Sequence, residues 1–155
     1  MSRAFVSEEA EESRAAAVPE RPVSTHPNLV TPNGLALIET ALVSAQSALA
    51  DAASDDTTRP RRLRDLRYWQ ARRATATPIE ARTSPPDEVV FGVLVTVKRG
   101  KITSRFRIVG EDEADPAQGL LSYVAPLAAA LLGAEAGETV EIEGREPVQV
   151  VAIEV

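Results

Sequence analysis

Three aspartates near the middle of the chain are the first residues whose type and spacing could do chemistry. Asp51, Asp55 and Asp56 lie at or near a predicted turn between two helices. Carboxylates held together at the end of a rigid arm can help to bind a hard cation such as Mg²⁺. The same residue type also caps helices and forms turns, and the sequence alone favours this second role.

Arginine dominates the segment that follows these acids. Residues 59–82 carry eight arginines against two acids, whereas residues 1–58 carry nine acids and three bases. We define the arginine cluster as Arg59, Arg61, Arg62, Arg64, Arg67, Arg72 and Arg73. The guanidinium fork fits phosphate and carboxylate, so the cluster predicts contacts with RNA phosphate or an acidic protein surface. The alternative is a solvated helix face that pairs with acids of the same chain.

Other site chemistries are excluded or lack a motif. The 155 residues contain no cysteine and one histidine, His26, which excludes disulfides, cysteine-ligated zinc and histidine-rich metal sites. The glycines form neither a P-loop nor a dinucleotide-binding motif. The acidic segment 111–115 lacks the spacing of a calcium loop and indicates a turn. The sequence therefore predicts no self-contained enzyme and no metal site of its own.

The bulk properties are those of a soluble protein. The net charge is −6, hydrophobic residues make up 44% of the chain, and no apolar run approaches the ~20 residues that span a bilayer. Residues 1–12 lack the apolar region of a signal peptide. We expect a cytoplasmic monomer with no membrane contact.

A helical hairpin is expected to carry the aspartates and the arginine cluster. Residues 1–28 form an acidic, proline-rich tail that we expect to be disordered. Thr31 and Pro32 suit the start of a helix that runs to Ala52. Its apolar seam alternates steps of three and four through Leu35, Ile38, Leu42, Ala45, Leu49 and Ala52. After a turn at 54–58, a second helix runs from Arg59 to Pro78 and completes an antiparallel hairpin over residues 29–78. We expect Trp69 to lie in the core between the two helices.

The pattern changes after a linker at residues 79–88. Alternating apolar residues predict strands at 89–97 and 102–109 around a turn that contains Gly100. In the second strand the alternation places Ile102, Phe106 and Ile108 on one side and Arg105 and Arg107 on the other. Further strands are expected at 120–124, 139–143 and 147–154, with a helix from Pro126 that Gly133 ends. Residues 89–155 are therefore predicted to form an α+β domain.

Several motifs of this C-terminal half resemble those of a known family. They are Phe91-Gly92, Arg105-Phe106-Arg107-Ile108-Val109-Gly110, Asp112-Glu113-Ala114-Asp115-Pro116, Leu121-Ser122-Tyr123, Ala125-Pro126-Leu127, Ala130-Leu131-Leu132-Gly133, Gly137-Glu138 and Val140-Glu141. Their order and spacing resemble the Gre-factor family of bacterial transcription elongation and transcript cleavage factors. Weaker matches at 29–34, 66–68 and 74–76 extend the resemblance to residues 29–155.

The resemblance implies a fold and a partner. The family combines an N-terminal antiparallel coiled coil with a domain similar to FK506-binding proteins, an α+β arrangement. It binds RNA polymerase, with the coiled coil in the secondary channel. Residues Tyr123, Val124, Pro126 and Leu127 would then dock the polymerase, and the arginine cluster would face nascent RNA or the channel wall. Any Mg²⁺ would be shared with the polymerase active site, because such a factor is not itself an enzyme.

This chain also departs from the family pattern. Its predicted hairpin is shorter by roughly ten residues per helix, or about 15 Å, and the acidic tip signature of the cleaving members is absent. Ala129 and Ala134 replace the usual arginine and lysine. A short-coil relative that does not cleave, the regulator of nucleoside diphosphate kinase, resembles this chain in hairpin length but less well in its C-terminal motifs.

The departures predict a regulator that does not stimulate cleavage efficiently. One alternative is an active cleavage factor that uses Asp55 and Asp56. A second, from a different class, is an isomerase or chaperone that works through the C-terminal domain.

Overall fold

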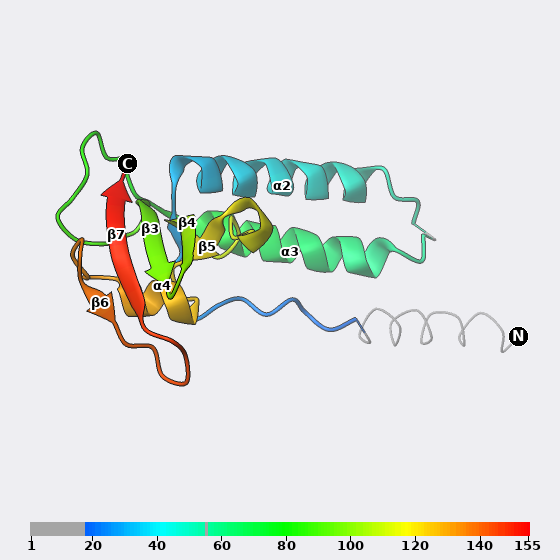
Figure 1. Cartoon of the computed structure of the whole chain (residues 1–155). Helices are drawn as coiled ribbons and strands as arrows, with labels where there is room; N and C mark the ends of the chain where they lie inside the picture. Colours follow the sequence, from blue (N-terminus) through cyan, green and yellow to red (C-terminus); the bar gives the residue numbers. More distant parts are fainter. Residues whose placement is uncertain (1–17, 55) are drawn as a thin grey trace, which may run out of the picture. The chain divides into compact units, whose positions relative to one another are not determined.

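The computed structural model describes residues 18–54 and 56–155, which form two units. Unit 1 comprises the described residues up to Thr25 together with Ile38–Thr75, and unit 2 comprises His26–Leu37 and Ala76–Val155. Figure 1 shows the helices of unit 1 and the sheet of unit 2. The predicted disordered tail lies outside the described residues up to residue 17, and residues 18–28 contain no helix or strand.

Unit 1 is built on two antiparallel helices, α2 (Pro32–Ala50) and α3 (Arg59–Thr75). Two contacts fix the antiparallel direction: Arg62 donates a hydrogen bond to the carbonyl of Ala48, and Arg73 lies 3.0 Å from Glu39. Ile38, on the predicted apolar seam, is fully buried. The predicted hairpin is therefore confirmed, although α2 ends two residues before the expected Ala52 and α3 three residues before Pro78.

The first turn of α2 belongs to unit 2. Thr31 caps the helix as expected, because its hydroxyl accepts a hydrogen bond of 3.0 Å from the backbone N–H of Gly34. The same hydroxyl donates to the buried carboxylate of Glu113, 82 residues further along the chain. This long-range partner ties the start of α2 to the rest of unit 2.

Two short strands, one on either side of the helical hairpin, pair with each other in unit 2. β1 (Leu29–Val30) and β2 (Thr77–Pro78) pair in parallel, with hydrogen bonds of 2.8 Å from Thr77 to Asn28 and 2.9 Å from Ile79 to Val30. The sequence assigned these residues to helix ends. Because residues 26–37 belong to unit 2, the predicted domain boundaries at 28/29 and 78/79 differ from the units that the contacts define.

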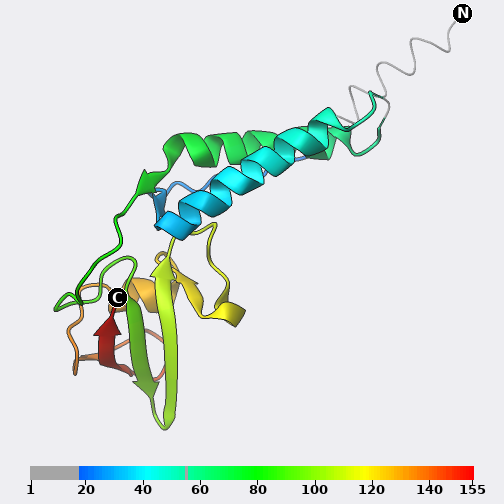
Figure 2. The same ribbon diagram turned by 90° about the horizontal axis from the view of Figure 1, so that it is seen from above.

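A five-stranded sheet forms the rest of unit 2, in the order β5-β4-β3-β7-β6. The strands are β3 (Leu94–Arg99), β4 (Ile102–Val109), β5 (Leu120–Ser122), β6 (Thr139–Val140) and β7 (Val148–Glu154). β3 pairs antiparallel with β4 and β7, and β5 pairs parallel with β4. The β3–β4 hairpin is seen along its length in Figure 2. A short 3-10 helix, η1 (Pro116–Gln118), precedes β5. This arrangement is the expected α+β fold.

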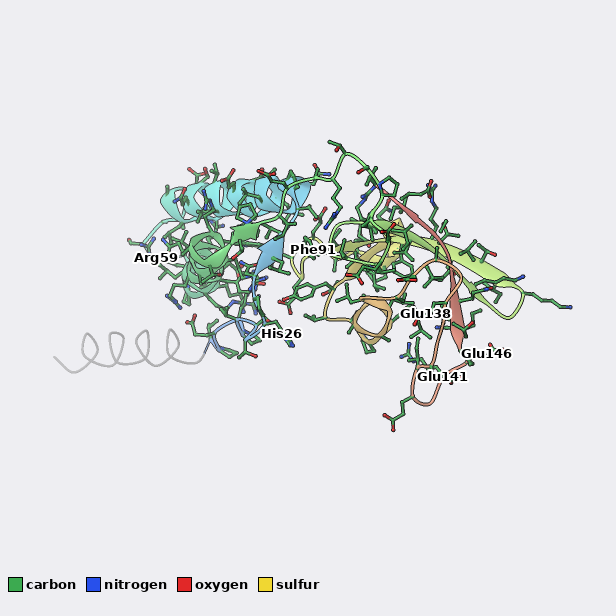
Figure 3. The ribbon with its side chains drawn as sticks, turned by 90° about the vertical axis from the view of Figure 1, so that its left-hand side faces the viewer. His26, Arg59, Phe91, Glu138, Glu141 and Glu146 are labelled. Carbon is green, nitrogen blue, oxygen red and sulfur yellow. The ribbon has the colours of Figure 1, made fainter. Side chains whose placement is uncertain are left out.

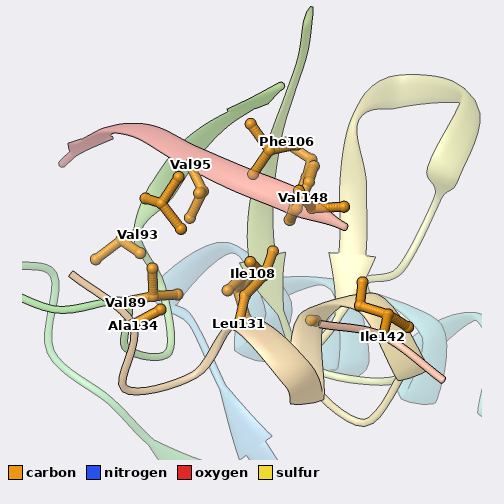
Figure 4. Close-up of a cluster of buried hydrophobic side chains, with 12 residues drawn as sticks. Val89, Val93, Val95, Phe106, Ile108, Leu131, Ala134, Ile142 and Val148 are labelled. Carbon is orange, nitrogen blue, oxygen red and sulfur yellow. The ribbon is translucent and has the colours of Figure 1, made fainter. Parts of the chain in front are cut away.

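The core of unit 2 lies between one face of this sheet and α4 (Pro126–Leu131) (Figure 4). Val95 and Ile108 from the sheet and Leu131 from α4 are fully buried. Because β4 alternates between the two faces, Arg105 is exposed and pairs with Glu154 at 2.8 Å. Ile102, expected on the apolar side of β4, is 69% exposed because it lies at the hairpin turn, beyond the part of the sheet that α4 covers.

Candidate functional site

The aspartates at the hairpin turn do not share one role. Asp56 accepts hydrogen bonds from the backbone N–H of Thr58 at 2.8 Å and from its hydroxyl at 2.7 Å. Its second oxygen lies 3.7 Å from Arg62. Asp56 therefore organises the turn before α3, as the capping alternative predicted. Asp55 lies outside the described residues, and Asp51 is exposed just beyond the end of α2.

Arg62 closes this end of the hairpin. Its guanidinium donates to the carbonyl of Ala48, in the last turn of α2, and also pairs with Asp56. A cation at the C-terminal end of a helix satisfies carbonyls that lack partners within the helix. Arg62 thus ties both helices and the turn together.

Acidification is expected to loosen this turn. Hydrogen bonds from Thr58 lower the pKa of Asp56, with a smaller contribution from Arg62. A lowered pKa means that the stabilisation is complete above the ordinary aspartate range and is lost as pH falls through the lowered pKa. We therefore expect the thermal midpoint of the wild-type chain to fall by a few degrees more than that of Asp56→Asn between pH 6 and pH 2, as measured by circular dichroism. Equal losses in both proteins would contradict this role.

Most of the arginine cluster already has partners within the chain. Arg64 contacts Asp65 at 3.0 Å, Arg67 is held by Glu20, and Arg73 contacts Glu39. Arg72 is only 2% exposed. The predicted contact of Arg72 with RNA or the channel does not agree with the structure, because this side chain is almost fully buried.

Two cluster arginines remain available at the start of α3. Arg61 is exposed and Arg59 is half-buried, and the ion pairs among the described residues involve neither of them. Figure 3 shows Arg59 extending from α3. Glu138, Glu141 and Glu146, labelled in the same figure, lie on the loops around β6 and β7. The available arginines thus lie on α3 of unit 1, whereas these three glutamates lie on loops of unit 2.

Trp69, expected in the hairpin core, is half-buried. It lines a groove of about 290 Å³ together with Ala41, Ala45 and Ala48 of α2. The small α2 side chains leave this groove because they cannot fill the space beside an indole ring. The ring also meets Tyr68 edge-on, with 5.0 Å between the ring centroids.

The predicted docking residues surround the start of α4. Pro126 is exposed at the first helical position, whereas Leu127 packs against the core. Tyr123 is half-buried; its hydroxyl donates to the carbonyl of Pro27 at 2.5 Å, and its ring meets Phe91 edge-on. Val124 is half-buried as well. The exposed surface of α4 consists of Pro126, Ala129 and Leu132, the last just past its end, and it carries no charge.

A cavity of about 270 Å³ in unit 2 was not anticipated from the sequence. Thr31, Phe91, Arg107 and Glu113 line it, and Arg107 donates a hydrogen bond of 2.8 Å to the carbonyl of Gly92. None of the predicted site residues lines this cavity. Its walls come from segments far apart in the chain, so no local spacing of residues could have indicated it.

The part of the chain that the structure describes contains neither a metal-binding cluster of side chains nor a membrane-spanning helix. Within residues 18–54 and 56–155, no three His, Cys, Asp or Glu residues are grouped in a way that could hold a metal ion. No helix in the same part of the chain has both the length and the apolar character needed to cross a membrane.

Comparisons with known proteins find similarity to transcription elongation factors. Residues 84–155 match the family model "Transcription elongation factor, GreA/GreB, C-term". The transcription elongation factor GreA of Desulfovibrio desulfuricans is 34% identical over 94 residues, which cover 57% of each chain. GreA of Xylella fastidiosa is 40% identical over 79 residues, 48% of this chain and 50% of the relative. The chain thus spans about half the length of the curated relatives that it matches.

A solved structure gives a weaker likeness over more of the chain. GreA factor homolog 1 of Thermus thermophilus aligns with 84% of this chain and all of its own, at 17% identity and a TM-score of 0.39. The match to the family model covers residues 84–155.

Proposed function

We propose that this chain, whose residues 84–155 match the GreA/GreB C-terminal domain, is a transcription elongation regulator of the Gre-factor family that binds RNA polymerase and acts through the secondary channel. The observation that carries the proposal is the family match over residues 84–155, which includes all of α4. The uncharged, exposed surface of α4 supports a docking role, because apolar surface free of charge is typical of the centre of a protein interface.

We further propose that the protein regulates without efficient stimulation of transcript cleavage. A carboxylate must touch a metal ion to help hold it. The Asp56 carboxylate is occupied by Thr58 and Arg62, which leaves Asp51 and Asp55 as the candidate tip acids. The helices are also short, at 19 and 17 residues. The resemblance implies family helices that are longer by roughly ten residues each, which corresponds to a loss of reach of about 15 Å.

Transcript cleavage in a backtracked polymerase complex from the same organism tests both parts. We expect the full chain alone to leave the cleavage rate at its basal value, and an excess of the chain to suppress the cleavage stimulated by a full-length Gre factor. Ala129→Glu, which places a charge on the α4 surface, provides the variant that should lose this competition.

Two other outcomes would change the proposal. Cleavage stimulated by the chain and lost in Asp51→Asn or Asp55→Asn would identify an active cleavage factor. An absence of competition at any concentration, together with no binding to the polymerase, would refute the polymerase-binding function itself.

A further inference from the structure

The segment before the hairpin contacts α3 through two adjacent residues. The Glu20 carboxylate accepts hydrogen bonds from Nε of Arg67 at 3.1 Å and from Nη2 of the same side chain. Arg21 lies 3.6 Å from Asp65, and its guanidinium carbon sits 3.8 Å from the centroid of the Tyr68 ring. All these residues belong to unit 1.

Glu20 and Arg21 each lie next to a residue of α3 with the opposite charge. Glu20 and Arg21 are an acid followed by a base, and the helix presents a base at Arg67 and an acid at Asp65. Tyr68 adds a ring face, a surface that attracts a guanidinium. The match is therefore between particular neighbours, and it goes beyond a general attraction between an acidic tail and a basic helix.

The contact with Arg67 has the geometry of phosphate recognition. A carboxylate that accepts two hydrogen bonds from one guanidinium fork uses the donors that a phosphate group would use. Arg21 likewise covers the Tyr68 ring, and an aromatic ring next to arginines is a platform on which the bases of single-stranded RNA stack. Glu20 and Arg21 thus occupy the two groups of α3 that such an RNA would need.

We propose that residues 20–21 form an intramolecular latch that competes with single-stranded RNA for Arg67 and Tyr68 of α3. RNA as the competitor rests on the proposed function, whereas the latch itself does not. The latch keeps the Arg67 guanidinium paired with Glu20 until RNA phosphate displaces that carboxylate.

Trp69 allows the latch to be measured without RNA. It is the only tryptophan of the chain, and the guanidinium of Arg21 lies 5.4 Å from its ring. We expect acrylamide to quench the fluorescence of the full-length Glu20→Gln/Arg21→Ala variant more strongly than that of the wild type. Glu154→Gln is the matched control, because it removes one acid from another exposed arginine pair, with Arg105 in unit 2. Identical quenching in all three proteins would overturn the latch and leave the proposed function untouched.

Binding of a labelled oligouridylate of about 12 nucleotides tests the competition. In fluorescence anisotropy at about 50 mM salt, we expect Glu20→Gln to bind about threefold more tightly than the wild type, and Glu154→Gln to bind equally. The gain should vanish in an Arg67→Ala background, because both variants act on one contact. A gain that persists without Arg67, or that Glu154→Gln reproduces, would refute competition at Arg67.

Discussion

Replacing Ala129 with glutamate is expected to weaken binding to RNA polymerase at least about tenfold. Ala129 is exposed near the middle of α4, so its side chain does not contribute to the core of unit 2. The fold should therefore accept the larger residue. At a docked surface, however, the new carboxylate would be buried without a partner, which costs more than about 1.4 kcal/mol and hence more than a factor of ten.

The measurement is the dissociation constant of the full chain for core RNA polymerase, for example by biolayer interferometry. Ala117→Glu is the matched control, because Ala117 is an exposed alanine of η1 and the substitution is the same. Circular dichroism verifies that both variants are folded. Equal affinities of the two variants would move the docking surface away from α4.

The second large effect concerns the base of the hairpin. A Cβ atom added at Gly110 would lie 2.3 Å from the carbonyl oxygen of Leu29, which belongs to the backbone of β1. The backbone must then shift, and the pairing of β1 with β2 and the Thr31–Glu113 hydrogen bond are expected to be disturbed. We expect Gly110→Ala to lower the free energy of unfolding by about 1–3 kcal/mol.

Urea unfolding followed by circular dichroism checks this value, and Gly34→Ala provides the comparison. Its added Cβ would meet the end of the Glu113 side chain at 2.9 Å, which can move more easily than backbone. Gly34 lies in a helix, where alanine gains up to about 1 kcal/mol over glycine. A Gly110→Ala protein as stable as Gly34→Ala would show that the approach of Leu29 to Gly110 does not matter.

The regular elements followed from local patterns in the sequence. The steps of three and four along α2 predicted the buried Ile38, and the alternation along β4 predicted the buried Phe106 and Ile108. Thr31 and Pro32 marked the start of α2 correctly. β1 and β2 were missed because a two-residue strand is too short to show any period.

The candidate site was less predictable, since its residues are defined by long-range partners. The sequence gives no reason to distinguish the seven arginines of one helix from each other. In the structure, however, Arg72 is buried, Arg62 closes the turn and Arg67 binds Glu20. Glu113 was assigned to an acidic turn, and its bond to Thr31 spans 82 residues. Such pairings depend on the tertiary fold, and the spacing of residue types along the sequence does not reveal them.

The parallel pairing of β1 with β2 has a consequence for how this protein could change in evolution. The hairpin begins soon after β1 and its chain ends just before β2, and because these two strands pair within unit 2, the crossing points where the chain enters and leaves the hairpin are neighbours. Equal insertions into α2 and α3 would lengthen the arm by about 1.5 Å per residue in each helix without moving either crossing point. The entropic cost of a longer excursion between them also grows only slowly. Selection can therefore adjust the reach of the arm separately from the proposed docking surface on α4.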